Sequence, residues 1–486
     1  MLFNSYIFIL VFLPVVISIY FALNACKQYK AGIIFLLLAS MIFYGYNHWS
    51  YLLLLSGSIV FNYLITLLFR KTLGKSRTAL VVFAVVMNVS VLFYFKYYNF
   101  FIDNVNNVFG LDWNVKKILL PLGISFFTFQ QISFVIDCYK DDSIRYDFWA
   151  YAAYVAFFPQ LVAGPIVTHE ELIPQFQDAR LKTPDFNNLS AGAYSFVMGL
   201  GKKVLIADNL SKIVAAGYGE VNELTSISAF VVMLSYTFQI YFDFSGYSDM
   251  ALGLARMVNL VIPTNFNSPY RAVSIGEFWE RWHMTLTRFL TRYIYIPLGG
   301  SRKGPARTCV NTMLVFIISG LWHGANWTFV LWGTLHGCFK VLERLTQKWF
   351  DRIPRILRWI YSFMVINVLW IYFRADSIAS ANQLIGRMVG FHGGGFNQSI
   401  LDAVFSPIEL RIVYHFLPIQ SETVFSICAL VVLLILLLFM VLYRKNVQKV
   451  VEHFKRSRWQ LMVTIVVLYW CIMSLSDVSE FLYFNF

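Results

Sequence analysis

The apolar run at residues 308–339, TCVNTMLVFIISGLWHGANWTFVLWGTLHGCF, contains no Asp, Glu, Lys or Arg. Basic segments at residues 302–307 and 340–358 flank it, and the positive-inside rule then places both of its ends in the cytoplasm. Because both ends lie on one side, the run must form a hairpin, with a polar, glycine-containing turn at residues 320–327. Each arm of roughly 15 residues rises about 23 Å, which is less than the hydrocarbon thickness of a bilayer.

The rest of the chain also has the composition of a membrane protein. Of the 486 residues 58% are hydrophobic and only 13% charged, too few charges to cover so much apolar surface in water. We therefore predict an all-α polytopic fold in a single membrane domain, residues 1–486. Residues 31–69 are long enough for two spans, with a hinge at 44–50. Further apolar stretches occupy residues 1–26, 79–95, 118–136, 148–169, 225–242, 359–373, 423–443 and 459–476.

The net charge of +13 comes from basic residues in the loops between these spans, so it indicates membrane topology and no nucleic-acid partner. Residues 1–26 lack a leading basic region and are interpreted as a retained first span. Basic loops after the first and third spans predict an extracytoplasmic N-terminus. The near-neutral segment 374–422 and the tail 477–486 are predicted to be extracytoplasmic as well, whereas charge does not orient residues 137–186.

Glycine and proline interrupt the apolar pattern at residues 121–123 and 157–165. Broken helices at membrane depth need protein or a water-filled cavity to satisfy their backbone groups, so the pattern indicates either a central cavity or ordinary kinks. No P-loop, HExxH or Gly-x-Ser-x-Gly motif occurs, and no metal site, zinc site or disulfide framework is predicted. The six cysteines are scattered without CxxC spacing: Cys26, Cys138, Cys309, Cys338, Cys428 and Cys471.

His323 lies at the predicted turn of the hairpin, at depth within the membrane. An ionisable residue there is costly and marks a functional site by default, and the alternative is an imidazole that hydrogen-bonds between helices. The glycines beside it suggest close approach of a ligand, and two tryptophans flank it. Other histidines are interpreted as packing or interfacial residues (His48, His336) or as loop residues (His169, His392, His415, His453).

Residues 276–292 predict an amphipathic helix at the cytoplasmic interface. Its arginines Arg281, Arg288 and Arg292 fall on one face, while His283 lies on the apolar side with tryptophans and leucines. The arginines could contact lipid headgroups or the phosphates of an acyl-coenzyme A. In residues 239–256 the carboxylates Asp243 and Asp249 need partners in apolar surroundings, either in structural ion pairs or along a substrate path.

Three ordered motifs carry a family resemblance: residues 278–286 (FWERWHMTL), 295–302 (YIPLGGSR) and 320–326 (GLWHGAN). The chain resembles the membrane-bound O-acyltransferase (MBOAT) family. Residues 158–165, 241–250 and 481–486 resemble its bacterial branch that serves alginate and peptidoglycan O-acetylation. Glu280 departs from the family pattern, which usually has a basic residue there. The resemblance implies a bundle of about 11–13 transmembrane or re-entrant helices around a central cavity.

The resemblance also implies a function: transfer of an acetyl group from acetyl-CoA, with no bound cofactor, across a bacterial inner membrane for O-acetylation of an extracytoplasmic polysaccharide. His323 and His283 carry over as catalytic residues, with His323 open as general base or acyl carrier. Substrate-binding residues are expected among Trp322, Asn326, Arg281, Arg288, Arg292, Asp243 and Asp249. An SGNH-type extracytoplasmic acetyltransferase is the expected partner, with segment 374–422 either docking it or capping the bundle. A non-enzymatic transporter is the alternative.

Overall fold

The computed structural model describes residues 1–475 and 481–482, and within these residues the chain is helical. The only strand-like pairing in this described part is a single bridge between Phe266 and Trp282. The predicted all-α class is therefore confirmed. Most of the tail 477–486, for which we predicted an extracytoplasmic side, lies outside the described residues.

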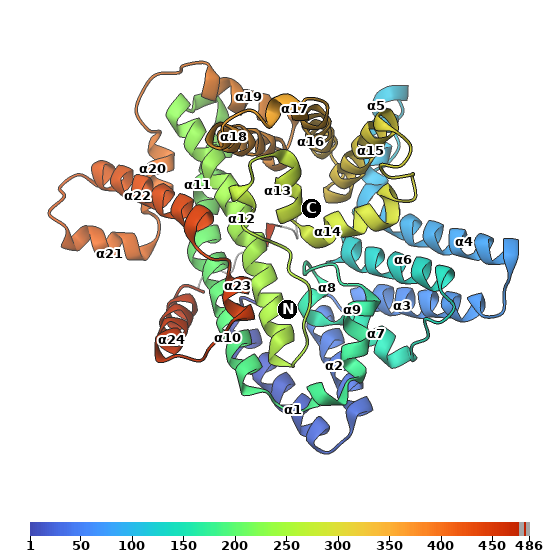
Figure 1. Cartoon of the computed structure of the whole chain (residues 1–486). Coiled ribbons are helices and arrows are strands. Elements are labelled where there is room, and N and C mark those ends of the chain that lie inside the picture. The colour runs from blue at the N-terminus through green and yellow to red at the C-terminus, as the bar shows by residue number, and fades with distance from the viewer. Residues whose placement is uncertain (476–480, 483–486) are drawn as a thin grey trace. The chain divides into compact units, whose positions relative to one another are not determined.

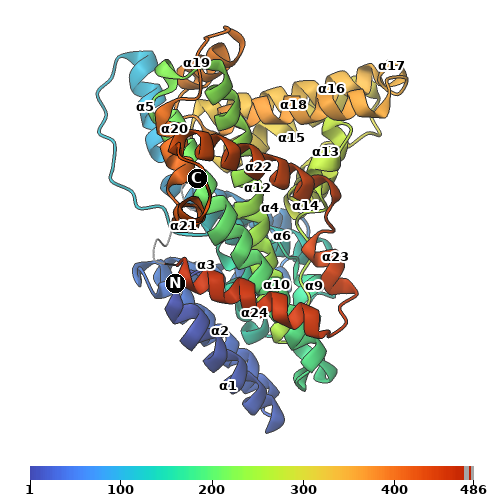
Figure 2. The same cartoon turned by 90° about the vertical axis from the view of Figure 1, so that its left-hand side faces the viewer.

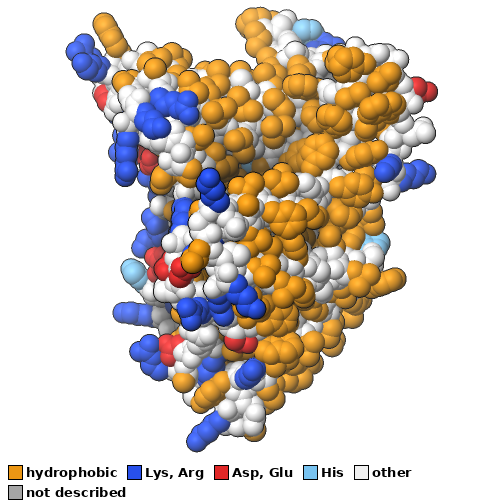
Figure 3. Space-filling view, turned by 90° about the vertical axis from the view of Figure 1, so that its right-hand side faces the viewer, with side chains coloured by type: hydrophobic (Ala, Val, Ile, Leu, Met, Phe, Trp, Pro, Cys, Tyr) orange, Lys and Arg blue, Asp and Glu red, His pale blue; other side chains and the backbone are white. Residues whose placement is uncertain are grey.

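Six of the described helical runs are long and apolar enough to cross a membrane, and two shorter apolar helices accompany them. Hydrophobic side chains also dominate the face shown in Figure 3, in a broad band with few charged side chains within it. On α3 (Ser50–Phe69) and α4 (Gly74–Leu92), for example, Leu53 is 68% exposed and Val82 is 55% exposed. Such exposed apolar helices fit a lipid environment. The total of about 11–13 spanning or re-entrant helices stays a prediction.

The chain divides into two compact units. Unit 1 comprises Met1–Leu200, Tyr247–Thr264 and Val450–Phe486, and unit 2 comprises Gly201–Gly246 and Asn265–Lys449. Helix α12 (Ser226–Met257) crosses the division without a break, and it is labelled in Figure 1. It is also longer than the predicted span 225–242. The division thus falls within a continuous helix and not in a linker. The single membrane domain stays a prediction.

Unit 1 begins with apolar helices joined by short turns. A π-helical turn (Phe8–Phe12) leads into α1 (Leu13–Ala25), which lies beside α2 (Tyr29–Gly45) in Figure 2. The predicted hinge at 44–50 is confirmed, because α2 ends at Gly45 and α3 begins at Ser50. The predicted short span 79–95 is wrong in length: α4, a π-helical turn and α5 (Tyr98–Phe109) form one helical run of 36 residues.

Both predicted helix breaks lie in unit 1, and they contact each other. Gly123 has a φ of +71° before α6 (Ile124–Lys140), and a Cβ there would lie 2.4 Å from the carbonyl oxygen of Leu161. The second break separates α7 (Phe148–Ala156), α8 (Phe158–Leu161) and α9 (His169–Gln177). Its Phe158 N–H donates to the Ser40 hydroxyl, and the Tyr154 hydroxyl donates to Val167. Protein groups thus satisfy backbone groups freed by this break, as the kink alternative requires.

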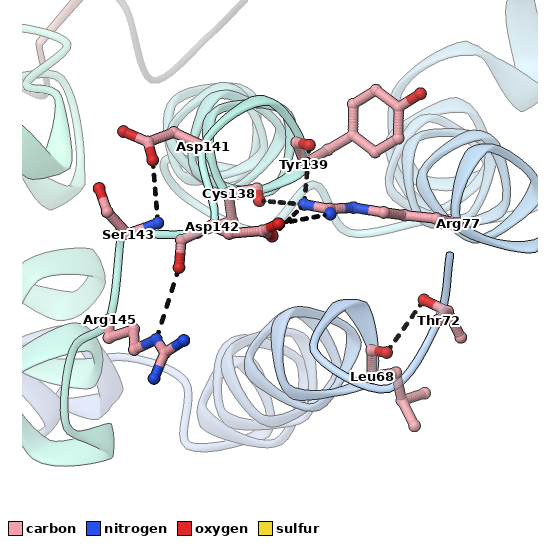
Figure 4. Close-up of polar contacts among 9 residues, drawn as sticks. All are labelled: Leu68, Thr72, Arg77, Cys138, Tyr139, Asp141, Asp142, Ser143 and Arg145. Carbon is pink, nitrogen blue, oxygen red and sulfur yellow. Dashed lines mark hydrogen bonds and ion pairs between the residues drawn. The ribbon is translucent and has the colours of Figure 1, made fainter. Parts of the chain in front are cut away.

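Polar side chains join the apolar helices of unit 1. The Asn62 amide of α3 donates to Asn88 of α4 and to Gln131 of α6, at 3.1 and 2.8 Å. At the end of α6, Arg77 donates to the carbonyl oxygens of Cys138 and Tyr139 and pairs with Asp142 (Figure 4). A cation at a helix C-terminus is favourable because its carbonyl oxygens carry partial negative charge.

Unit 2 contains the predicted hairpin, formed by α15 (Pro305–His323) and α16 (Trp327–Leu345). Each arm has 19 residues and is therefore longer than predicted. A Cβ at Gly320 would lie 2.3 Å from the carbonyl oxygen of Phe329, and one at Gly333 would lie 2.4 Å from that of Phe316. The expectation that Gly320 admits a ligand is thus wrong, because the glycines let the two helices touch.

The other helices of unit 2 come before and after this hairpin in the chain. Before it come the unit 2 part of α12, α11 (Asp208–Gly219), α13 (Ile275–Arg281) and α14 (Met284–Leu290). After it come α17 (Gln347–Phe350), α18 (Arg355–Arg374) and α22 (Glu422–Tyr443). The predicted non-spanning segment 374–422 contains three short helices: α19 (Ile378–Val389), α20 (Gln398–Phe405) and α21 (Ile408–Phe416). Of these helices, α13 contacts α16 and α18.

We predict that Gly333→Ala destabilises the protein by about 1–3 kcal/mol, because the new methyl group overpacks the contact between α15 and α16. Gly386→Ala in α19 is the matched control. A Cβ at Gly386 meets nothing within 4 Å, so this substitution should cost nothing. Thermal unfolding of both variants in detergent checks the prediction. Equal melting temperatures would contradict the close helix contact.

Candidate active site

His323 is the last residue of α15, and aromatic rings of unit 2 enclose its imidazole. The side chain is 2% exposed. Its ring centroid lies 4.9 Å from that of Trp322, 5.1 Å from that of Trp332 and 5.2 Å from that of Phe373. Trp327, the other tryptophan expected beside it, is 54% exposed. The imidazole therefore lies in a pocket of aromatic side chains that limits the access of water.

His283 lies close to His323, with 6.4 Å between the ring centroids. It separates α13 from α14 and adopts a left-handed backbone conformation, with a φ of +46° and a ψ of +50°. The predicted continuous helix over residues 276–292 is therefore wrong. After this break, the Met284 N–H donates to the Asn265 carbonyl instead of a helical acceptor. A left-handed non-glycine residue is uncommon, and such strain is concentrated at functional sites.

The hydrogen bonds of Asn265 define the protonation of His283. The Asn265 Oδ1 atom accepts from the Thr285 N–H and hydroxyl, and it lies 3.1 Å from His283 Nδ1. Because the backbone N–H can only donate, this atom acts as an acceptor, and His283 Nδ1 must carry the proton. Burial lowers the pKa of His283, which lies outside the candidate membrane-spanning helices, to about 3. The imidazole is thus neutral, with its basic lone pair on Nε2.

Further buried aromatic residues pack around Trp332, which contacts His323. The Trp279 indole N–H donates to His336 Nδ1 at 3.2 Å, and both residues are buried. The Trp332 ring stacks on Trp370 at 5.7 Å and contacts His336 at 4.8 Å. His336 is therefore a packing residue and not an interfacial one. No sequence motif pointed to Trp332 or Trp370, although the four-residue spacing of Trp332 and His336 places these two on one helical face.

Glu343 anchors the helix that leads to His283. Its carboxylate accepts the backbone N–H groups of Ile275 and Gly276 at the start of α13, at 2.7 and 3.2 Å. These N–H groups have no partner within their own helix, and a carboxylate is favourable beside them. No local sequence pattern marks Glu343, because its partners Ile275 and Gly276 lie on a segment far away in the chain.

The three predicted arginines do not share one helical face, since the break at His283 separates Arg281 from the other two. Arg281 pairs with Glu277 at 2.8 Å and donates to the Asn267 carbonyl. Arg288 lies in the last turn of α14, and Arg292 lies in the π-helical turn that follows (Thr291–Tyr295), with its guanidinium 5.4 Å from the Tyr293 ring centroid.

The remaining predicted site residues have diverse surroundings. Asp243 forms a buried ion pair with Lys203 at 2.7 Å, and Lys203 also pairs with Asp208. This is the structural arrangement that the sequence left open. Asn326 precedes α16 and caps it: its side chain accepts from the Thr328 N–H and donates to the Asp376 carbonyl. Asp249 is buried in unit 1, whereas both histidines belong to unit 2.

Comparison with known proteins assigns the chain to a family. The pattern of the membrane-bound O-acyltransferase family, MBOAT, matches residues 41–381, which include His283, His323 and the hairpin turn. The chain belongs to this family. It is an acyltransferase, and the predicted enzyme class is confirmed, which favours the enzyme over the transporter alternative.

The relatives of this acyltransferase modify different polymers. It is 39% identical to the peptidoglycan O-acetyltransferase of Helicobacter pylori, across 100% of this chain and 98% of that protein. It is also 39% identical to a probable alginate O-acetylase of Pseudomonas aeruginosa, across 80% of this chain and 75% of that protein. A teichoic acid D-alanyltransferase of Bacillus subtilis is 23% identical over 47% of this chain.

We predict that acid destabilises the wild-type acyltransferase more than it destabilises the His283→Asn variant. Burial gives His283 a folded-state pKa of about 3 against an ordinary value of 6.5. Between these values only the unfolded chain binds the proton, so stability is lost as the pH falls below 6.5. Asparagine tolerates the left-handed conformation and does not titrate. Melting temperatures between about pH 7 and pH 5 measure the difference, and parallel profiles would contradict the prediction.

Proposed function

We propose that this acyltransferase takes an acetyl group from acetyl-CoA on the cytoplasmic side of a bacterial inner membrane and relays it for O-acetylation of an extracytoplasmic polysaccharide. The observation that carries the proposal is the pair of buried imidazoles, His283 and His323, in an aromatic pocket of an acyltransferase. Likeness to the peptidoglycan O-acetyltransferase along 100% of the chain supports peptidoglycan as the polymer. An alginate-like polysaccharide is the second candidate, with 39% identity over 80% of the chain.

The pocket suits transfer from a thioester to a hydroxyl group. The hydroxyl oxygen of the acceptor attacks the acetyl carbonyl carbon of acetyl-CoA. The C–S bond breaks, and coenzyme A leaves as its thiol. An imidazole accepts the hydroxyl proton and returns it to the leaving sulfur, so the base is regenerated. We assign this role to His323, with His283 beside it to orient the reacting groups. The enclosing rings of Trp322, Trp332 and Phe373 reduce loss of the acetyl group to water.

Basic residues that follow His283 in the chain suit the phosphates of the donor. Arg288 and Arg292 follow His283 in the chain by five and nine positions, and residues 302–307 add further basic side chains. Arginine binds phosphate oxygens through two parallel N–H donors. Arg281 is already held by Glu277 and Asn267, and we assign it to positioning α13. The donor thus enters from the side where the basic loops lie.

The acceptor side requires a second protein. Coenzyme A is too large and too charged to cross a membrane with its acetyl group, so the acetyl group alone has to be relayed. We propose that an extracytoplasmic acetyltransferase of the SGNH type receives it. Segment 374–422 offers exposed apolar side chains for this contact, such as Ile408 at 68% and Phe416 at 81% exposure. These residues lie in α21, one of the short helices of the segment.

We predict that His323→Ala abolishes acetyl transfer while the protein still inserts into the membrane. The variant loses the base but leaves the hairpin contact of Gly320 and Gly333 intact. The assay uses vesicles that contain the purified protein, radiolabelled acetyl-CoA and the partner, and it measures labelled product. The exposed His453→Ala, outside segment 374–422, is the matched control. An inserted His323→Ala protein with wild-type transfer would exclude the assigned base. Transport of a solute without acetyl-CoA consumption by the wild type would support the transporter instead.

We also predict that Lys348 in α17 and Asp402 in α20 lie on opposite sides of the membrane, because flanking charge orients the spans. Single cysteines at these exposed positions, in a variant without the six native cysteines, should react with an impermeant thiol reagent from opposite sides. In intact spheroplasts only Asp402→Cys should label, and Lys348→Cys should label after lysis. Labelling of both in intact spheroplasts would overturn the predicted topology and, with it, the proposed relay.

A further inference from the structure

A cluster of potential metal ligands lies in unit 1, whereas the two histidines assigned to acyl transfer belong to unit 2. Asp137 comes from the C-terminal end of α6, and His169 and Glu170 are the first residues of α9. One ligand atom from each side chain lies within 4.8 Å of the other two. Asp137 and His169 are buried, with 3% and 0% exposure, whereas Glu170 is exposed. The predicted position of His169 in a loop is therefore wrong.

The separation of His169 and Asp137 is that of two ligands around one ion. His169 Nε2 lies 3.3 Å from Asp137 Oδ2, whereas a charge-assisted hydrogen bond spans about 2.7–2.9 Å. Among the described residues, this buried nitrogen has no hydrogen-bond partner. Two ligands at about 2.0–2.1 Å from a tetrahedral cation lie roughly 3.3–3.4 Å apart. The nitrogen and the oxygen therefore have the spacing of two ligands that share a cation.

The other nitrogen of the same ring is held in the manner of a metal-bound histidine. The Tyr146 hydroxyl lies 3.2 Å from His169 Nδ1, and the Phe134 ring packs against the imidazole at 5.4 Å. A histidine that binds a metal usually hydrogen-bonds through its second nitrogen, which fixes the ring orientation and the tautomer. When Nδ1 donates its proton to the phenol oxygen, the Nε2 lone pair faces the Asp137 carboxylate. A cation between them removes that repulsion.

We propose that Asp137, His169 and Glu170 bind one divalent transition-metal ion. One imidazole and two carboxylates match Zn²⁺ best, with Mn²⁺ as the nearest competitor. Rotation of the exposed Glu170 side chain brings in the third ligand, and water completes the coordination. Glu171 is committed elsewhere, because it accepts from the Thr168 N–H in the capping box of α9. The proposal departs from the sequence expectation of no metal site and does not depend on the proposed function.

The ion would act as a clamp between helices. α6 ends beside Asp137, and α9 begins at His169, so the bound ion joins two segments that enclose the broken stretch 157–165. A ligand that binds only the folded state raises its stability in proportion to the logarithm of its concentration above Kd. Metal removal should therefore lower the melting temperature of the full-length protein.

The test uses purified full-length protein without a polyhistidine tag, stripped with EDTA and dialysed against limiting ZnCl2, MnCl2 or MgCl2. We expect one Zn²⁺ per chain by mass spectrometry of bound metal, a higher melting temperature with Zn²⁺, and no such effect of Mg²⁺. The Co²⁺-loaded protein should show d–d absorption without a sulfur charge-transfer band. Such a band would place the ion on the scattered cysteines and overturn the assignment.

Two variants and a control localise the ion. Glu170→Gln keeps the size of an exposed side chain and should weaken Zn²⁺ binding about tenfold or more, as loss of a ligand or its support does. His169→Ala should abolish binding, and Glu170→Gln decides the question if that variant does not fold. Asp112→Asn, at an exposed carboxylate elsewhere in unit 1, should bind as the wild type does. Equal binding by all variants would indicate adventitious metal, and no binding by the wild type would leave a simple histidine–aspartate pair. Either result overturns the proposal.

Discussion

The contact between α15 and α16 fixes the geometry on which the site depends. At Gly320 and Gly333 the two backbones approach so closely that a Cβ would lie 2.3 and 2.4 Å from carbonyl oxygens. Only glycine permits this approach, which brings the helices together along their length. His323 ends α15 directly after this contact, so its imidazole faces Trp332 of the opposite helix at 5.1 Å. A wider separation of the helices would open the pocket to water.

Buried polar pairs then hold the other elements of unit 2. Apolar surroundings make an unpartnered polar group costly, so each pair also fixes the two segments that it joins. Glu343 of α16 binds the start of α13, and Lys203 binds Asp243 of α12. The Thr237 hydroxyl joins α12 to Asn367 of α18 at 2.6 Å. Unit 1 uses amide groups of Asn62, Asn88 and Gln131 in the same way.

Much of the fold follows from local features of the sequence. The flanking charges and the absence of charge within 308–339 were sufficient to predict the hairpin, because the cost of burying a charge in lipid is large and local. Glycine and proline predicted the breaks at Gly123 and 157–165, where the backbone cannot continue a helix. The prediction of a continuous helix over 276–292 was wrong. After His283 the Met284 N–H donates to the carbonyl oxygen of Asn265, a residue outside that segment, and not to a helical acceptor.

The sequence by itself determined the membrane class, the hairpin, the family and the two histidines, since composition, charge and motifs are properties of short segments. Only the tertiary structure decided that His283 and His323 lie 6.4 Å apart, and that Trp332, Phe373 and Glu343 build the surroundings of the site. It also brought Asp137 of α6 to His169 of α9. Such pairings join segments far apart in the chain, and their energies depend on packing that no local pattern encodes.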